Sequence, residues 1–245
     1  MLGIGLLAYG LGLIVMFPAT LLDAGVQRAS AGRLRIAEAQ GTFWRGTGQI
    51  EIRDAGGRTG IAKRLAWRFR PASLLRGLLD CDVEIDQASK PFLVTISPVR
   101  IEIAHAEATV PVTALGLGVP KLAPLGLTGD LLLHVGKLSF STAGRPSVQG
   151  DARLQWRSAG STLTSLAPLG DYELQLVGEG AQVRAALRTI SGPLQLEGKG
   201  AWASGANPVF TATARVAPEH QQQLAPLLRL IALERSAGNF ELQLR

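Results

Sequence analysis

The three histidines are the first residues to consider as metal ligands or general bases. His105 and His134 fall in stretches where apolar and polar side chains alternate, as in strands, and His220 lies near the start of a helical stretch. A zinc site needs several Cys or His ligands close together, whereas these histidines are widely separated and the chain has one cysteine. The spacing therefore predicts structural histidines and no bound metal.

A row of carboxylates at every second position is the best candidate for a cation site. Its members are Asp80, Asp82, Glu84 and Asp86. An EF-hand loop needs glycine at its sixth position, where this row has Ile85. In a strand the four side chains share one face, and the run before them carries a row of arginines. Those arginines are Arg64, Arg68 and Arg70. The pattern predicts opposite charges on adjacent strands, which contribute roughly 0.2–1 kcal/mol per pair, rather than calcium binding.

Cys81 is the candidate for a thiol nucleophile. It alternates with Val83 and Ile85, so its side chain is expected to point inward, where a thiol stays protonated and inert. The sequence also lacks a G-x-S-x-G nucleophile elbow and a G-x-G-x-x-G loop that opens a helix. We therefore expect no enzymatic activity and no cofactor.

The glycine-rich stretch AQGTFWRGTG, residues 39–48, raises the question of phosphate binding. A P-loop ends in Gly-Lys-Ser/Thr and opens a helix, whereas Gly46-Thr47 lacks the lysine and Gln49–Ile52 alternates like a strand. Glycine bulges beside a large ring explain the stretch better. The tryptophans expected to pack as structural anchors are Trp44, Trp67 and Trp156.

Strands account for most of the hydrophobic pattern. Short alternating runs separated by turn signals such as Gly56-Gly57 are typical of half-buried antiparallel sheet. The expected strands include Leu65–Arg70, Cys81–Asp86, Phe92–Ser97, Val99–Ala104, Asp130–Val135, Ala152–Arg157, Tyr172–Val177, Ala181–Arg188, Leu194–Gly198, Phe210–Val216 and Phe240–Leu244. Two segments look helical, Pro71–Gly77 and Pro218–Ser236, the second kinked or divided by Pro226.

The composition limits the partners of the chain. Its 245 residues carry a net charge of +6, which favours anionic neighbours, although the arginines are scattered. Aromatic residues make up only 5%, and no basic stretch is interleaved with stacking rings, so nucleic-acid binding is not expected. One cysteine cannot form an intrachain disulfide, which is compatible with any compartment.

No charged side chain occurs from Met1 to Leu22. At about 1.5 Å per residue, such a helix nearly crosses a hydrocarbon core of roughly 30 Å. Pro18 is expected to end it near the membrane interface. No clear Ala-x-Ala cleavage site follows, so a retained transmembrane anchor is predicted; a cleaved signal peptide and a buried helix are the alternatives.

Small residues recur on one side of the expected anchor. Gly5, Ala8 and Gly12 share a helical face, and small residues let another membrane helix approach closely. The hypothesis is a helix-packing face; the alternative is the ordinary tolerance of membrane helices for glycine.

The charges around the anchor leave its orientation open. No Lys or Arg precedes the span, and Arg28, Arg33 and Arg35 follow it. The positive-inside rule would place the following domain in the cytoplasm, although long domains translocate largely regardless of charge.

Two tryptophan motifs suggest an internal duplication. LAWRF with Trp67 and LQWRS with Trp156 each end a strand and lead through a Leu-rich connection to another one. The division predicted is an anchor at residues 1–22, a first β unit at 23–120 and a second at 121–245, which can form one continuous domain. The alternative is that Gly- and Leu-rich β proteins produce such echoes by chance.

Several segments, taken in order, resemble one known family. They are FPA (17–19), GTFWRG (41–46), WRFRPASLLRG (67–77), APLGLTGDL (123–131), PLGDYELQL (168–176), SGPLQLEGKG (191–200) and LAPLLRLIALERSAGNFELQL (224–244). Together they resemble the type II secretion system protein N family over essentially the whole chain. The resemblance implies a single-pass inner-membrane protein with a periplasmic β-rich domain and no enzymatic activity. It implies an accessory role beside the inner-membrane platform subunits or the secretin, in the export of folded proteins across the outer membrane.

Two classes of function fit a membrane-tethered β domain. One is a scaffold in contact with the lipid bilayer, which docks a segment of another envelope protein by strand addition at a sheet edge. The other is an envelope protein whose apolar sheet face forms a groove that binds or transfers lipid. An envelope hydrolase is the weakest option, because no nucleophile–base pair is evident.

Overall fold

The computed structural model describes residues 16–53, 59–86, 90–113, 124–224, 227, 233–236 and 239–244. The chain forms two compact units, Met1–Ser97 and Pro98–Arg245. Both are mainly antiparallel sheet, as the alternation predicts. Within the described ranges no helix is long and apolar enough to cross a membrane. Most of the expected anchor, Met1–Val15, lies outside these ranges, so the anchor and the division at residue 120 stay predictions.

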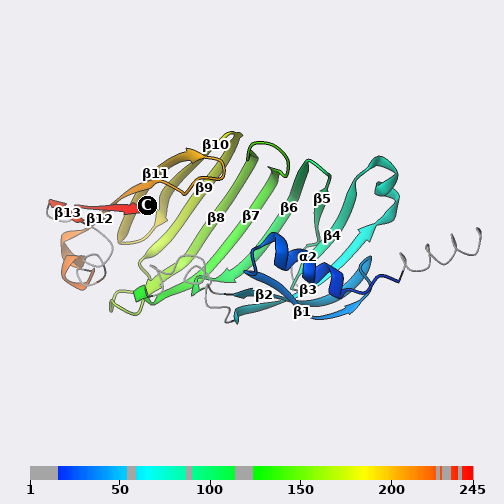
Figure 1. Ribbon diagram of the computed structural model, residues 1–245. Helices are drawn as coiled ribbons and strands as arrows, with labels where there is room; N and C mark the ends of the chain where they lie inside the picture. The colour runs from blue at the N-terminus through cyan, green and yellow to red at the C-terminus, as the bar shows by residue number, and fades with distance from the viewer. Residues whose placement is uncertain are drawn as a thin grey trace, which may run out of the picture. The chain divides into compact units, whose positions relative to one another are not determined.

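The first unit is an antiparallel meander in which strands that are neighbours in sequence are neighbours in the sheet (Figure 1). Its described strands are β1 (Leu34–Gly41), β2 (Arg45–Arg53), β3 (Thr59–Arg70), β4 (Leu79–Ile85) and β5 (Phe92–Ile96). The 3-10 helix η1 (Pro71–Arg76) joins β3 to β4 where a short helix is expected, and Gly77 ends it in the left-handed conformation (φ 69°).

A helix that the sequence analysis did not predict covers the apolar face of this sheet. Helix α2 (Thr20–Ala29) begins two residues after Pro18, with Asp23 in its first turn and Arg28 in its last, as the helix dipole favours. Leu22 and Val26 pack against a core of buried side chains. That core consists of Ala19, Ile36, Leu65, Trp67, Phe69 and Cys81. Figure 1 shows α2 lying across the sheet of this unit.

Helix α2 also occupies the free edge of β1. The carboxylate of Asp23 accepts a hydrogen bond from the backbone N–H of Ile36 at 2.8 Å. The hydroxyl of Ser30 accepts one from the N–H of Leu34 at 3.0 Å. Farther along β1, Glu38 takes a positive φ of 52° at a break in the register with β2. Capped amides and a bulge both discourage another strand from pairing there, so strand addition at this edge is obstructed.

The second unit is also antiparallel and nearly follows chain order. Its described strands are β6 (Arg100–Pro111), β7 (Leu127–Ser141), β8 (Val148–Ser161), β9 (Gly170–Gly180), β10 (Gln182–Ser191), β11 (Leu194–Ala203), β12 (Phe210–Val216), β13 (Leu233–Ser236) and β14 (Asn239–Leu244). The order changes only at the end, where β12 pairs with β14 and β13 pairs with the outer side of β14.

The register of the second unit collects apolar side chains on one face. One row runs through Ala108, Leu133, Leu154, Leu174 and Leu187, which lie directly opposite one another on five successive strands. All five are half-buried. This face is an extended apolar surface whose side chains shield one another in part.

A separate buried cluster closes one end of the second unit. Leu224 and Leu227 pack there with Leu169, Leu194 and Val216. They belong to the segment in which a helix is predicted over Pro218–Ser236. Pro218–His220 forms a 3-10 turn and Gln221–Leu224 is helical, but Leu233–Ser236 is strand β13. The predicted helix is therefore wrong at its end, because pairing with β14 overrides the weak helical pattern there.

Candidate functional site

The face of the first unit opposite α2 carries the charged rows. Arg70 lies directly opposite Asp80, and Arg68 directly opposite Asp82. The guanidinium of Arg70 reaches diagonally instead and donates two hydrogen bonds to Asp82, at 2.9 and 2.6 Å. Lys63 forms an ion pair with Asp86. The expected face of opposite charges is present, with partners shifted along the strands.

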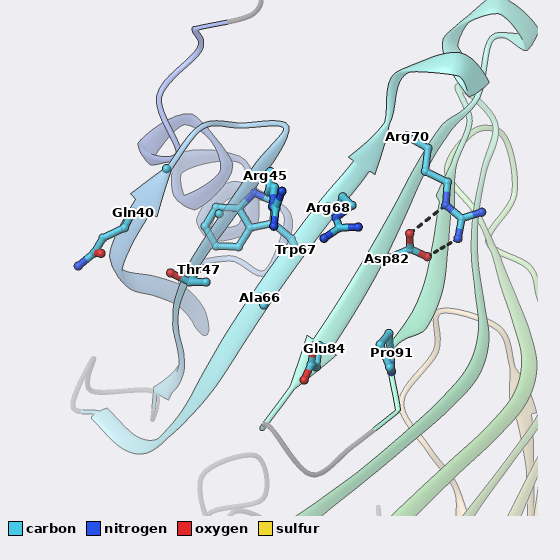
Figure 2. Close-up of a pocket in the computed structure, with 12 residues that line it drawn as sticks. Gln40, Arg45, Thr47, Ala66, Trp67, Arg68, Arg70, Asp82, Glu84 and Pro91 are labelled. Atoms are coloured by element: carbon cyan, nitrogen blue, oxygen red, sulfur yellow. Dashed lines mark hydrogen bonds and ion pairs between the residues drawn. The ribbon is translucent and has the colours of Figure 1, made fainter.

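A cleft of about 600 Å³ opens on this charged face. It is lined by Gln40, Gly41, Arg45, Gly46, Thr47, Ala66, Trp67, Arg68, Arg70, Asp82, Glu84 and Pro91. Figure 2 shows the pair between Arg70 and Asp82 at one side of the cleft and Gln40 at the other. Thr47 and Ala66, which have small side chains, line the cleft together with the exposed side chains of Arg45, Arg68 and Arg70.

Aromatic packing behind the cleft holds its strands in place. The indole N–H of Trp67, which is only 3% exposed, donates hydrogen bonds to the carbonyls of Phe43 at 3.0 Å and Thr42 at 3.3 Å. Phe43 stacks on Phe69 with ring centroids 4.8 Å apart, and Trp44 meets both rings edge-on. The stretch GTFWRG is thus the β1–β2 connection and supports an aromatic cluster rather than a phosphate site.

Trp156 has a similar arrangement in the second unit. Its indole N–H donates to the carbonyl of Thr128 at 3.0 Å, and its ring lies 5.7 Å from that of Tyr172. Trp67 packs over Gly46 and Trp156 lies beside Gly129, each a glycine of the preceding strand. The duplication itself stays a prediction. The anchoring role of Trp44, Trp67 and Trp156 stays a prediction that stability measurements can test.

The remaining candidates for chemistry do not converge. Burial raises the pKa of Cys81 to about 11, so its thiol stays protonated at neutral pH. His105 lies in β6 and His220 in a 3-10 turn, and the Nδ1 atom of His134 lies 3.2 Å from the carboxylate of Glu107. Among the described residues, no group of three or more His, Cys, Asp or Glu is placed to hold a metal ion. The proposed helix-packing residues Gly5, Ala8 and Gly12 lie outside the described ranges.

A buried carboxylate in the second unit escaped the sequence analysis. Glu173 on β9 is 3% exposed. Arg188 donates to it at 2.9 and 2.6 Å, and Gln155 donates at 3.1 Å. Burial opposes ionisation, but these hydrogen bonds and the charges of Arg188 and Arg153 lower the pKa of Glu173 overall. The register that sets Gln155 and Arg188 on either side of Glu173 was not evident in the local pattern.

Comparison with known proteins gives a match to a family model. A family model described as type II secretion system (T2SS), protein N, matches residues 32–243. That range includes the described strands of both units, except for the last residue of β14, and begins after helix α2. No curated protein and no solved structure matches the chain. The chain therefore belongs to the type II secretion system protein N family.

Proposed function

We propose that this chain is an accessory inner-membrane component of the type II secretion system. In this role residues 1–22 anchor the chain, and both β units lie in the periplasm as an interaction scaffold for the export of folded proteins. The family match over residues 32–243 carries the proposal. The uncharged stretch at the N-terminus supports the anchor.

The described chemistry suits contact rather than turnover. Cys81 is buried, with its pKa raised to about 11. The polar groups that reach the surface of the first unit form a charged face with a cleft. Because α2 caps the edge of β1, we expect partners to bind the charged face rather than extend the sheet at that edge. The partners proposed are the inner-membrane platform subunits or the secretin.

Two measurements in cells test this proposal. An alkaline phosphatase fused to the C-terminus is expected to be active, because the enzyme folds only in the periplasm. An affinity-tagged full chain, expressed from its own promoter, is expected to co-isolate platform subunits after mild cross-linking. An inactive fusion would contradict the orientation, and co-isolation no better than that of an unrelated tagged membrane protein would contradict the scaffold.

Lipid binding is the second candidate, and the apolar face of the second unit favours it. The row from Ala108 to Leu187 leaves five successive strands with half-buried apolar side chains, and such a surface can shelter acyl chains. Native mass spectrometry of the full chain should then show bound lipid, and Leu154→Glu should remove it. If Leu154→Glu and wild type carry the same lipid, this face is not the site.

A further inference from the structure

We infer that the cleft of the first unit binds an acidic side chain in an extended segment of a partner protein, through Arg45 and Arg68. The inference deepens the proposed scaffold role and rests on it, since a scaffold needs a partner. The cleft lies within the first unit, because the residues that line it all belong to that unit.

Two like charges face each other in the cleft. Arg45 on β2 lies directly opposite Arg68 on β3 in the antiparallel register. Like charges directly opposite one another destabilise a sheet. Both side chains are exposed and line the cleft. A pair that weakens the fold is the kind of feature that a binding site retains.

Asp82 lies directly opposite Arg68 on β4, but Arg70 holds its carboxylate, so Asp82 forms no ion pair with Arg68. Two neighbouring cations have an anionic partner: Arg70 is held by Asp82, and Lys63 by Asp86. Neither Arg45 nor Arg68 forms an ion pair within the ranges that the structure describes. Two guanidinium groups on adjacent strands provide several N–H donors that match a carboxylate. Thr47 and Gln40 line the same cleft and add neutral hydrogen-bonding groups.

The surroundings favour a peptide over an anionic membrane surface. A second hollow of about 520 Å³ shares Gln40, Thr47, Ala66 and Glu84 with the cleft, so the two form one groove. Beyond the shared residues, the second hollow adds two carboxylates and one arginine, which are Glu38, Asp86 and Arg64. Anionic headgroups would meet these carboxylates, whereas a peptide can carry one acid and one base.

The distance along β2 sets the spacing of the charges expected in the ligand. The pair Arg45 and Arg68 and the pair Gln49 and Arg64, each directly opposite across β2 and β3, are four residues apart along β2. That separation is about 13 Å at roughly 3.3 Å per residue. An extended segment that follows the groove would therefore place Glu or Asp at the arginines and Lys or Arg about four residues away.

A peptide array tests this directly. The probes are immobilised heptapeptides rich in Val and Thr. Each carries one Glu and one Lys, with the Lys four residues before or after the Glu. Matched control peptides carry Gln in place of Glu. Detergent-solubilised full chain should bind the Glu peptides about tenfold more tightly, as a bidentate arginine–carboxylate contact warrants. Arg45→Gln and Arg68→Gln should each abolish that preference. Arg184→Gln, which removes an exposed arginine paired with Glu179 in the other unit, should leave it intact.

Melting temperature separates a binding role from a structural one. Arg68→Gln should keep or raise Tm, because it relieves repulsion with Arg45 while Asp82, directly opposite Arg68, keeps its partner Arg70. Equal binding of Glu and Gln peptides overturns the inference, and so does a Tm that falls together with the preference. It is also overturned if vesicles of phosphatidylglycerol, but not the peptides, bind in a manner that depends on Arg45 and Arg68.

Co-isolation of platform subunits with the tagged chain tests the scaffold role separately. If the array shows no preference while the tagged chain still co-isolates platform subunits, the cleft assignment fails and the scaffold stands. If the preference is present but no subunit co-isolates, the cleft assignment stands and the scaffold fails.

Discussion

The indole N–H of Trp67 lies 3.0 Å from the carbonyl oxygen of Phe43, to which it donates a hydrogen bond. This contact joins the middle of the first unit's sheet to the β1–β2 connection. Trp67→Phe should lower the free energy of unfolding by about 1–3 kcal/mol, because it removes the donor to the part-buried carbonyl of Phe43. Urea unfolding followed by circular dichroism measures the change.

Trp202 offers a matched control for that substitution. It is half-buried on β11, and its indole donates no hydrogen bond within the described residues. Trp202→Phe should therefore cost clearly less than Trp67→Phe. Equal costs would show that the ring volume, and not the hydrogen bond to Phe43, holds the connection.

Two glycine substitutions should have opposite signs. A Cβ at Gly46 would lie 2.5 Å from the ring of Trp67 and would clash with the carbonyl of Gln40, so Gly46→Ala should destabilise the fold by roughly 1–3 kcal/mol. A Cβ at Gly25 in α2 meets nothing within 4 Å. Gly25→Ala should stabilise by roughly 0.5–1 kcal/mol through helix propensity. Thermal unfolding of both variants tests the pair, and a stabilising Gly46→Ala would contradict the packing described.

The alternation of apolar and charged residues predicts which side chains lie on the charged face. It does not predict which of them form ion pairs. The runs around Trp67 and Cys81 predict the two strands and their faces correctly. Arg70 nevertheless pairs with Asp82 rather than with Asp80 directly opposite it, because a long side chain can reach a diagonal neighbour. That choice depends on rotamers and on the twist of the sheet, neither of which a sequence pattern specifies.

Helix α2 was missed for a different reason. Leu21 and Leu22 extend the uncharged run, so the sequence assigns them to the membrane anchor, whereas Leu22 packs on the sheet. Strand β13 was assigned to a helix because four residues are too few for alternation to compete with a helical pattern. In both cases a contact with distant residues decides the local structure.

The cap on β1 gives a prediction about Asp23. Asp23→Ala removes the acceptor of the Ile36 amide at the sheet edge. Hydrogen exchange at Ile36 should accelerate at least tenfold, and the protein should associate more readily, because a free strand edge pairs with other chains. Exchange followed by mass spectrometry measures the first effect and light scattering the second. Unchanged protection at Ile36 would mean that the carboxylate does not guard the edge.

Cys81 predicts an alkaline limit on stability. Its pKa is raised to about 11 from an ordinary value of 9.0, chiefly by burial. The unfolded chain therefore loses this proton first, and stability falls as pH rises from about 9 to 11, by up to about 1.4 kcal/mol per pH unit. Cys81→Ala should flatten this part of the profile. A variant with the same pH dependence as wild type would show that the thiol is not the group responsible.

Secretion of a folded cargo protein tests whether this chain takes part in type II secretion. Deletion of the gene should reduce the cargo recovered outside the cell and leave it in the periplasm, and the full chain supplied in trans should restore release. Gly46→Ala, if it unfolds the first unit, should restore release less well than Gly25→Ala does. Cargo release that is the same with and without the chain, at native levels of every other secretion subunit, would contradict a role in this export system.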